Sequence, residues 1–193
     1  MTIRKAQPED KEAIATYMLL AMEDIVYQFI GEKSHEKATR FLVNLIGKKA
    51  NQYSYENCWV IETENEVVAV AVVYDGAKLH ELRAPVAQAV KSMFNRDFNP
   101  EDETKAGEYY IDSIGVAPHQ QGKGLGAKLL QFLIDTYVYK RKETLGLLVD
   151  KENPDAKKLY LKLGFEVVGE KMLAGKNMEH LIFKTKNRPY GAV

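Results

Sequence analysis

The feature that most constrains the fold is residues 110–130, whose pattern is that of a β-strand, a glycine-rich turn and a helix. β-Favouring residues run up to Pro118, which ends the strand because proline cannot donate to a sheet ladder. Glycines then occupy every second position, at Gly122, Gly124 and Gly126. Apolar residues that recur every four positions from Leu125 predict one apolar face of a helix. The sequence therefore predicts a helix whose N-terminus points at the glycine turn.

Such a turn has the chemistry of an anion site. The first N–H groups of a helix have no partner within the helix, and the positive end of the helix dipole lies there. Glycine lets phosphates approach the backbone without meeting a Cβ atom, and Lys123 adds a positive charge inside the turn. The spacing matches neither the dinucleotide fingerprint G-x-G-x-x-G nor the phosphate loop G-x-x-x-x-G-K-[ST]. A ligand-free glycine turn before a capped helix is the alternative.

A second stretch, residues 153–169, places Asn153, Tyr160, Gly164 and Phe165 ahead of an outgoing strand. Together with the pattern Gln-x-x-Gly-x-Gly at 121–126, it resembles the two characteristic blocks of the GNAT superfamily, the acyl-CoA-dependent N-acyltransferases. The blocks are separated by a helix and a strand, as that fold requires. The resemblance spans nearly the whole chain, and residues 77–107 are its main departure.

The resemblance implies one α/β domain over residues 1–193, with a mixed, mostly antiparallel sheet of six to seven strands flanked by about four helices. Residues 77–107 are expected to form an extra helix, opening at Pro85, and then a polar irregular stretch. We expect this part to be a surface insertion. Long loops inside compact domains are often functional or mobile, which is the alternative.

An acetyl-CoA site is the main functional implication of the resemblance. Its pyrophosphate is expected on the backbone of the glycine turn, at Gln121, Gly122, Lys123, Gly124, Leu125 and Gly126. The pantetheine arm is expected to pair like a strand with Ile114 and Val116. A glycine between them, Gly115, indicates a bulge or a close backbone approach. Asn153 is expected either to hydrogen-bond the pantetheine or only to cap its helix.

The chemistry implied is acyl transfer from a thioester to an amine. Tyr160 is the general-acid candidate, because its phenol can protonate the departing sulfur; packing against the sheet is the alternative. The Val116 N–H is expected to stabilise the developing oxyanion. Glu108, Tyr110 and Asp112 alternate on one face of the key strand.

Many family members use a Glu on this strand as the base, but the aligned position holds Tyr110. Asp112 and Glu108 are therefore the candidates for the base or for binding a cationic amine. Glu108 standing exposed at the end of the strand is the alternative.

Composition narrows the function classes. Lys and Arg number 27 and Asp and Glu also 27, so no basic field points to nucleic acid. No wholly apolar run approaches the ~20 residues that span a bilayer, and the start lacks an apolar leader core. The single Cys58 cannot form an internal disulfide, and the four His residues lack metal-ligand spacing. We therefore expect a cytoplasmic protein without a metal, membrane or nucleic-acid partner, and by family analogy a homodimer.

The sequence thus predicts an N-acetyltransferase that moves acetyl from acetyl-CoA to a primary amine. The acidic strand face favours a small cationic amine or amino acid as the acceptor. A protein or peptide amine, a non-catalytic acyl-CoA-binding module and a purely structural interaction domain are the alternatives.

Overall fold

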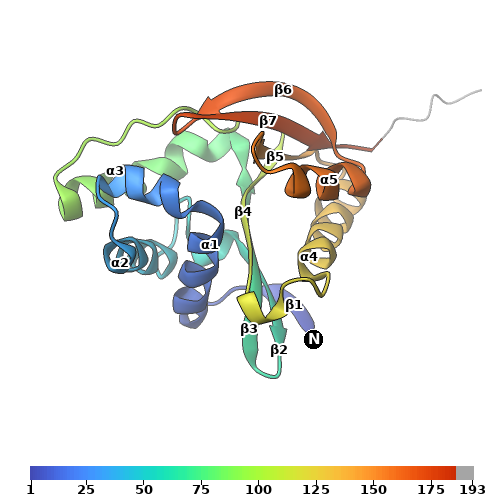
Figure 1. The fold of residues 1–193 in the computed structure, drawn as a ribbon, viewed down its shortest axis with the longest axis horizontal. Coiled ribbons are helices and arrows are strands. Elements are labelled where there is room, and N and C mark those ends of the chain that lie inside the picture. Colours follow the sequence, from blue (N-terminus) through green and yellow to red (C-terminus); the bar gives the residue numbers. More distant parts are fainter. Residues whose placement is uncertain (186–193) are drawn as a thin grey trace, which may run out of the picture.

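The computed structural model describes residues 1–185 of the chain. Seven strands form one sheet in the order β1-β2-β3-β4-β5-β7-β6 (Figure 1). Neighbouring strands are antiparallel except β4 and β5, which are parallel. The strands are β1 (Thr2–Lys5), β2 (Cys58–Thr63), β3 (Glu66–Asp75), β4 (Tyr109–Val116), β5 (Leu145–Asp150), β6 (Glu166–Leu173) and β7 (Lys176–Phe183).

Helices cover both faces of the sheet. They are α1 (Lys11–Ile30), α2 (His35–Ile46), α3 (Leu79–Phe94), α4 (Leu125–Leu133), which continues as the π-helix η5 (Ile134–Lys140), and α5 (Pro154–Leu163). In Figure 1 the sheet is seen nearly edge-on, with α1, α2 and α3 on one side and α4 and α5 on the other. Strand β3 lies between the two layers, and residues 67–74 are all buried, as expected for a strand covered on both faces. The predicted fold class is therefore confirmed, with α3 as the extra helix.

Helix α1 forms much of the core beside β3 and β4. Its regular backbone is interrupted at Met22, where φ is −139° and ψ is 26°. Residues Pro8–Ile30 have a mean hydropathy of 1.3 and form the one described helix that is long and apolar enough to cross a membrane. Buried core helices meet the same test, and several apolar side chains of α1, among them Ile14, Met18 and Val26, are fully buried. Packing against the sheet therefore accounts for its apolar composition.

The expectation of a surface insertion at 77–107 is wrong for part of that stretch. Helix α3 begins at Leu79, so Pro85 lies inside the helix rather than at its start. The irregular chain after it brings Glu103 and Thr104 into the interior, with exposures of only 5% and 2%. An acidic side chain can be buried there because the Arg83 guanidinium, on α3, pairs with the Glu103 carboxylate. The burial therefore depends on a residue from another element.

Strands β4 and β5 separate along their length. They pair from Tyr109 opposite Leu145 to Ile111 opposite Leu147, and no pairing between them follows within the described residues. The register between β3 and β4 also shifts here, because Ser113 lies opposite Val72 while Ile111 lies opposite Val73. Asp112 is thus the extra residue of a β-bulge. Beyond the bulge the two parallel strands diverge and leave a gap in the middle of the sheet.

Candidate active site

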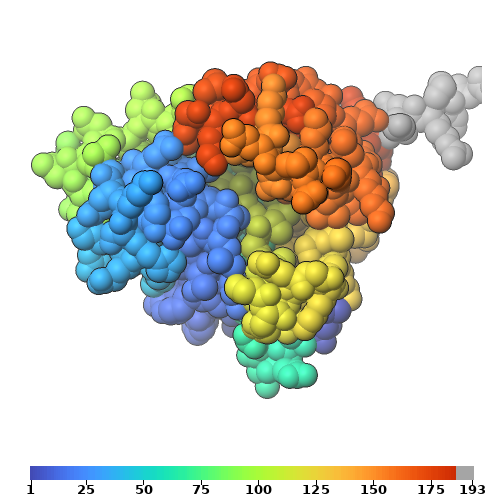
Figure 2. Space-filling view, in the orientation of Figure 1, coloured from blue at the N-terminus to red at the C-terminus, as the bar shows by residue number. Residues whose placement is uncertain are grey.

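The gap between β4 and β5 is a cleft of about 380 Å³. Figure 2 shows it as a hollow between α1, the glycine turn and α5, with part of β4 visible at its floor. Its lining includes six of the residues predicted for the cofactor and the chemistry in addition to Asp112, namely Ile114, Gly115, Val116, Gln121, Asn153 and Tyr160. Local motifs that are far apart in the sequence thus meet in one place.

The edge of β4 that faces the gap offers unpaired backbone groups. The Ala117 N–H donates to the Val68 carbonyl of β3 at 2.9 Å. Successive N–H groups of a strand point to opposite edges. The N–H groups of Ile114 and Val116 therefore point away from β3, toward the cleft. This orientation suits a ligand amide that pairs with the strand.

Gly115 has a packing role that is independent of any ligand. A Cβ atom at this position would overlap the carbonyl oxygen of Tyr17 on α1. Of the two predictions for this glycine, a close backbone approach is confirmed, whereas the bulge lies three residues earlier, at Asp112. The close contact lets α1 pack directly on β4 and bring Met22 to the cleft.

The glycine turn has the backbone geometry that an anion site needs. Gly122 and Gly124 have φ values of 76° and 77°, in the left-handed region that other residues rarely adopt. Helix α4 begins at Leu125, and no described group accepts a hydrogen bond from the backbone N–H groups of residues 122–127. Residues 122–126 are not part of the cleft lining but follow Gln121, whose amide donates to the Val116 carbonyl at 3.2 Å. Unpaired donors therefore lie beside the outer end of the cleft.

The other side of the cleft carries Asn153 and Tyr160. The side-chain Oδ1 of Asn153 accepts the Ala156 N–H at 3.2 Å, so the capping role is confirmed. This cap uses only the oxygen of the side chain. The Tyr160 ring packs edge-on against Phe165 with centroids 5.9 Å apart, and its hydroxyl has no hydrogen-bond partner among the described residues. Burial raises the pKa of Tyr160, which keeps the phenol protonated at neutral pH.

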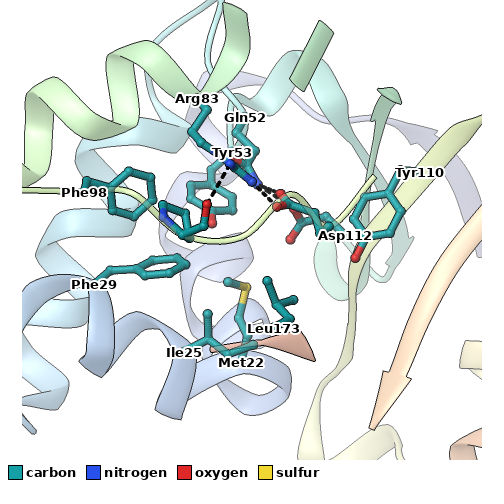
Figure 3. A pocket seen from close by; sticks show the side chains of 12 residues that line it. Met22, Ile25, Phe29, Gln52, Tyr53, Arg83, Phe98, Tyr110, Asp112 and Leu173 are labelled. Atoms are coloured by element: carbon teal, nitrogen blue, oxygen red, sulfur yellow. Dashed lines mark hydrogen bonds and ion pairs between the residues drawn. The ribbon is translucent and has the colours of Figure 1, made fainter. Parts of the chain in front are cut away.

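A smaller inner pocket of about 40 Å³ continues from the cleft. Five residues line both spaces and mark their junction: Met22, Ile25, Tyr110, Asp112 and Leu173. Figure 3 shows apolar side chains of α1 on one side of this pocket and Gln52, Tyr53 and Asp112 on the other. The cleft thus ends beside a carboxylate.

Asp112 shares its hydrogen-bond donors with a second carboxylate, Glu103. The Gln52 amide nitrogen lies 2.9 Å from Asp112 Oδ2 and 2.6 Å from Glu103 Oε1. The Tyr74 hydroxyl lies 3.0 Å and 2.9 Å from the same two oxygens. Because Tyr74 has a single hydroxyl hydrogen, it can donate to only one of them at a time. The second oxygen of Asp112, Oδ1, has no hydrogen bond within the described part of the chain.

These surroundings set the protonation of Asp112. Burial raises the pKa of Asp112, and the negative charge of Glu103 raises it further, toward neutral. The hydrogen bonds from Gln52 and Tyr74 and the charge of Arg83 act in the opposite direction but are smaller. A carboxylate with a pKa raised toward neutral suits proton transfer at physiological pH.

Glu108 lies apart from the cleft and from the inner pocket. Its carboxylate contacts His180 Nε2 on β7 at 2.8 Å and accepts the Thr104 hydroxyl at 2.7 Å. Glu108 is only 6% exposed, so it is not a solvent-exposed strand end. Burial alone would raise the pKa of Glu108, but the bonds from His180 and Thr104 lower it below its ordinary value. The structure therefore brings Asp112 to the cleft and places Glu108 in a separate hydrogen-bonded contact with His180 and Thr104.

Four residues of the network were not predicted as site residues: Gln52, Tyr74, Arg83 and Glu103. They come from four separate segments, and none belongs to a local motif. The only sequence signal was the length of the polar irregular stretch at 95–107, after the expected extra helix, which pointed to function as an alternative. Within residues 1–185, no three His, Cys, Asp or Glu side chains are grouped to hold a metal ion.

Comparison with known proteins places the chain in a family. A 5-NmdU N-acetyltransferase of Pseudomonas phage PaMx11 is 38% identical over 71 residues, which are 37% of this chain and 49% of that protein. A probable spermine N(1)-acetyltransferase of Bacillus subtilis subsp. natto is 36% identical over 72 residues, which are 36% of this chain and 47% of that protein. The matches thus span about half the length of these relatives.

Solved structures share the fold over nearly the full length. An N-acetyltransferase from Staphylococcus aureus Mu50 has a TM-score of 0.82 at 24% identity, covering 95% of this chain and 100% of that one. A structure described as an acetyltransferase has a TM-score of 0.79 at 29% identity, covering 96% and 100%. The sequence model of the acetyltransferase (GNAT) family matches residues 20–165. The chain therefore belongs to the acetyltransferase (GNAT) family.

Proposed function

We propose that the protein is an N-acetyltransferase that moves acetyl from acetyl-CoA to the primary amine of a small cationic acceptor. The observation that carries this proposal is the junction at Asp112. On one side of it lies a cleft edged by unpaired strand and helix N–H groups. On the other side lies a pocket with two carboxylates. An acyl donor and an amine held in these two spaces would meet at Asp112.

Acetyl-CoA fits the residues of the cleft. The donors of the glycine turn suit its pyrophosphate, since the two left-handed glycines present bare N–H groups at the start of α4. The β4 edge at Ile114 and Val116 suits the amides of the pantetheine arm. When bound, acetyl-CoA supplies an acetyl group activated as a thioester. Holding it beside the amine would provide proximity, a major part of the rate enhancement of bimolecular reactions.

Asp112 and Tyr160 can handle the two protons of the reaction. Asp112 Oδ1, which is free of hydrogen bonds, takes a proton from the ammonium, and the neutral amine then attacks the thioester carbon. The Val116 N–H donates to the carbonyl oxygen as negative charge develops on it. Tyr160 protonates the departing sulfur and recovers a proton from the new amide nitrogen. The products are the acetylated amine, free CoA thiol and the proton on Asp112, which passes to solvent.

The experiment is the release of CoA thiol from acetyl-CoA across a panel of small amines, amino acids, polyamines and short peptides. The proposal predicts release that depends on the acceptor and is strongest with a small cationic amine. Release with peptides alone would contradict the small-acceptor part of the proposal. Acetyl-CoA binding without release with any acceptor would favour a binding module instead.

A further inference from the structure

The lining of the inner pocket limits which acceptor amines can bind, more narrowly than the lining of the cleft does. We propose that it selects a primary monoamine: one positive charge, a short apolar body and no carboxylate. This inference rests on the proposed function and narrows its substrate class. Three features of the pocket support it: its charge balance, its apolar wall and its size.

The charge balance of the lining leaves one negative charge without a cationic partner. The pocket is lined by one cation, Arg83, and two carboxylates, Glu103 and Asp112. Arg83 pairs with Glu103 and, at 2.9 Å, with Asp102. Its terminal nitrogens also donate to the carbonyls of Pro100 and Glu101, at 3.2 Å and 3.1 Å. Asp112 has no ion pair with any described residue, so a single ammonium would balance the site when Asp112 is ionised.

An acceptor carboxylate would find little to bind in the pocket. Of the five N–H donors of Arg83, only Nε lacks a partner within residues 1–185, and that nitrogen is buried. Glu103 and Asp112 would both repel a second anion. Gln52, which is 3% exposed, turns its amide nitrogen to these carboxylates and leaves its own oxygen without a hydrogen bond. An additional anion beside these acceptors would be desolvated without compensation.

The wall opposite the carboxylates is apolar. Phe29 of α1 and Phe98 of the insertion pack edge-to-face with ring centroids 4.8 Å apart, and the other apolar members are Met22, Ile25 and Leu173. A second ammonium facing this wall would lose its hydration and gain no carboxylate. The apolar body of an amine would instead bury its surface there.

The volume limits the length of that body. A cavity needs a volume of roughly 10–15 Å³, counted as the space open to the centre of a water-sized sphere, to hold one water-sized group. The 40 Å³ of the inner pocket therefore accommodates about three such groups. A chain of about three carbons, with its amine at Asp112 and its body against Phe29 and Phe98, satisfies all three features.

The test compares three acceptors that differ only at the far end: propylamine, 3-aminopropanoate and 1,3-diaminopropane. With the wild-type protein, we expect kcat/KM for propylamine to exceed that of each of the other two by at least about tenfold. Equal or better use of 3-aminopropanoate or 1,3-diaminopropane would overturn the inference while leaving the proposed function intact. Absence of thiol release with every amine would instead contradict the proposed function itself.

A charge added to the apolar wall provides a second arm. Phe98→Asp should raise the ratio of kcat/KM for 1,3-diaminopropane to that for propylamine by about tenfold. Val168→Asp adds the same charge at a 51% exposed position of β6 outside the pocket lining, and should leave the ratio as in wild type. An unchanged ratio in a Phe98→Asp protein that still binds acetyl-CoA would contradict the inference. If that variant does not fold, the three-acceptor comparison alone decides.

Discussion

The two carboxylate oxygens of Asp112 have different hydrogen-bonding environments. Oδ2 is held by Gln52 and Tyr74, which fixes the orientation of the group, whereas Oδ1 is free to accept a proton. The same donors also hold Glu103. Two carboxylates that share donors in a buried site favour a proton on one of them. The reactivity of Asp112 is therefore a property of this pair and not of one residue.

Glu103→Gln should shift the pH profile. The base acts only when ionised, so activity falls as the pH drops through the pKa of Asp112. Removing the negative charge of Glu103 lowers that pKa, and the acidic limb of kcat/KM against pH should move to lower pH. Asp97→Asn removes a carboxylate that is 96% exposed on the same segment, and should not move the limb. A limb at the wild-type position in Glu103→Gln would refute the coupling.

Tyr160→Phe should lower kcat by about 10²–10³-fold, a range typical of the loss of a general acid. Acetyl-CoA affinity and thermal stability should stay near wild type, because the Tyr160 hydroxyl has no hydrogen-bond partner among the described residues. Tyr139→Phe removes a hydroxyl from a 49% exposed ring and serves as the control. Steady-state kinetics and calorimetric titration separate the two effects. Full turnover in Tyr160→Phe would remove this residue as the acid.

At the scale of elements, the parts of the site that local sequence determines were predictable. The glycine turn and the Asn153 cap each depend on neighbours a few residues away, whereas the predicted alternation of Glu108, Tyr110 and Asp112 along β4 is interrupted by the bulge at Asp112. Glu103 was not predictable, because an acidic residue in a polar stretch has no local signal for burial. Its position depends on Arg83, twenty residues earlier, and on Lys171, whose ammonium donates to the Glu103 carbonyl at 3.3 Å. The bulge at Asp112, beyond which β4 and β5 separate, was likewise not predictable, because no glycine or proline marks it.

The glycine turn yields a prediction at this scale. Gly124→Glu should weaken acetyl-CoA binding, because a carboxylate beside the first N–H groups of α4 competes with phosphate. Gly124→Asn is the matched control, since Asn tolerates the left-handed backbone and adds no charge. Calorimetric titration should show at least about a tenfold weaker affinity for the Glu variant than for the Asn variant. Equal affinities would mean that pyrophosphate does not bind at this turn.

At the scale of the whole molecule, the irregular part of the insertion, residues 100–103, is hydrogen-bonded to two separate elements, α3 and β6. Arg83 of α3 holds residues 100–103 through side-chain and backbone acceptors, and Lys171 of β6 donates to the carbonyls of Asp102 and Glu103. The inner pocket proposed for the acceptor therefore combines α1, the insertion and β6, whereas the cleft proposed for acetyl-CoA lies between β4, β5 and α5. Amine binding and cofactor binding should thus respond differently to loss of the insertion.

Arg83→Met tests this separation. It leaves Glu103 buried without its cation, which is expected to cost about 3–5 kcal/mol of unfolding free energy. The KM for the amine should rise more than the Kd for acetyl-CoA. Lys91→Met removes an exposed ion pair with Asp97 and should cost at most about 1 kcal/mol. Urea unfolding measures the free energy, steady-state kinetics the KM and calorimetric titration the Kd. A parallel loss of both affinities would refute separate binding regions.

The measurement that tests the central claim most directly is CoA thiol release by wild type and by Asp112→Asn with the same small amine, together with acetyl-CoA affinity. Asn keeps the shape of the side chain but cannot take a proton. The account predicts a loss of kcat/KM of about 100-fold or more, with acetyl-CoA affinity within about twofold of wild type. An Asp112→Asn protein that turns over like wild type would contradict the assignment of Asp112 as the base at the junction.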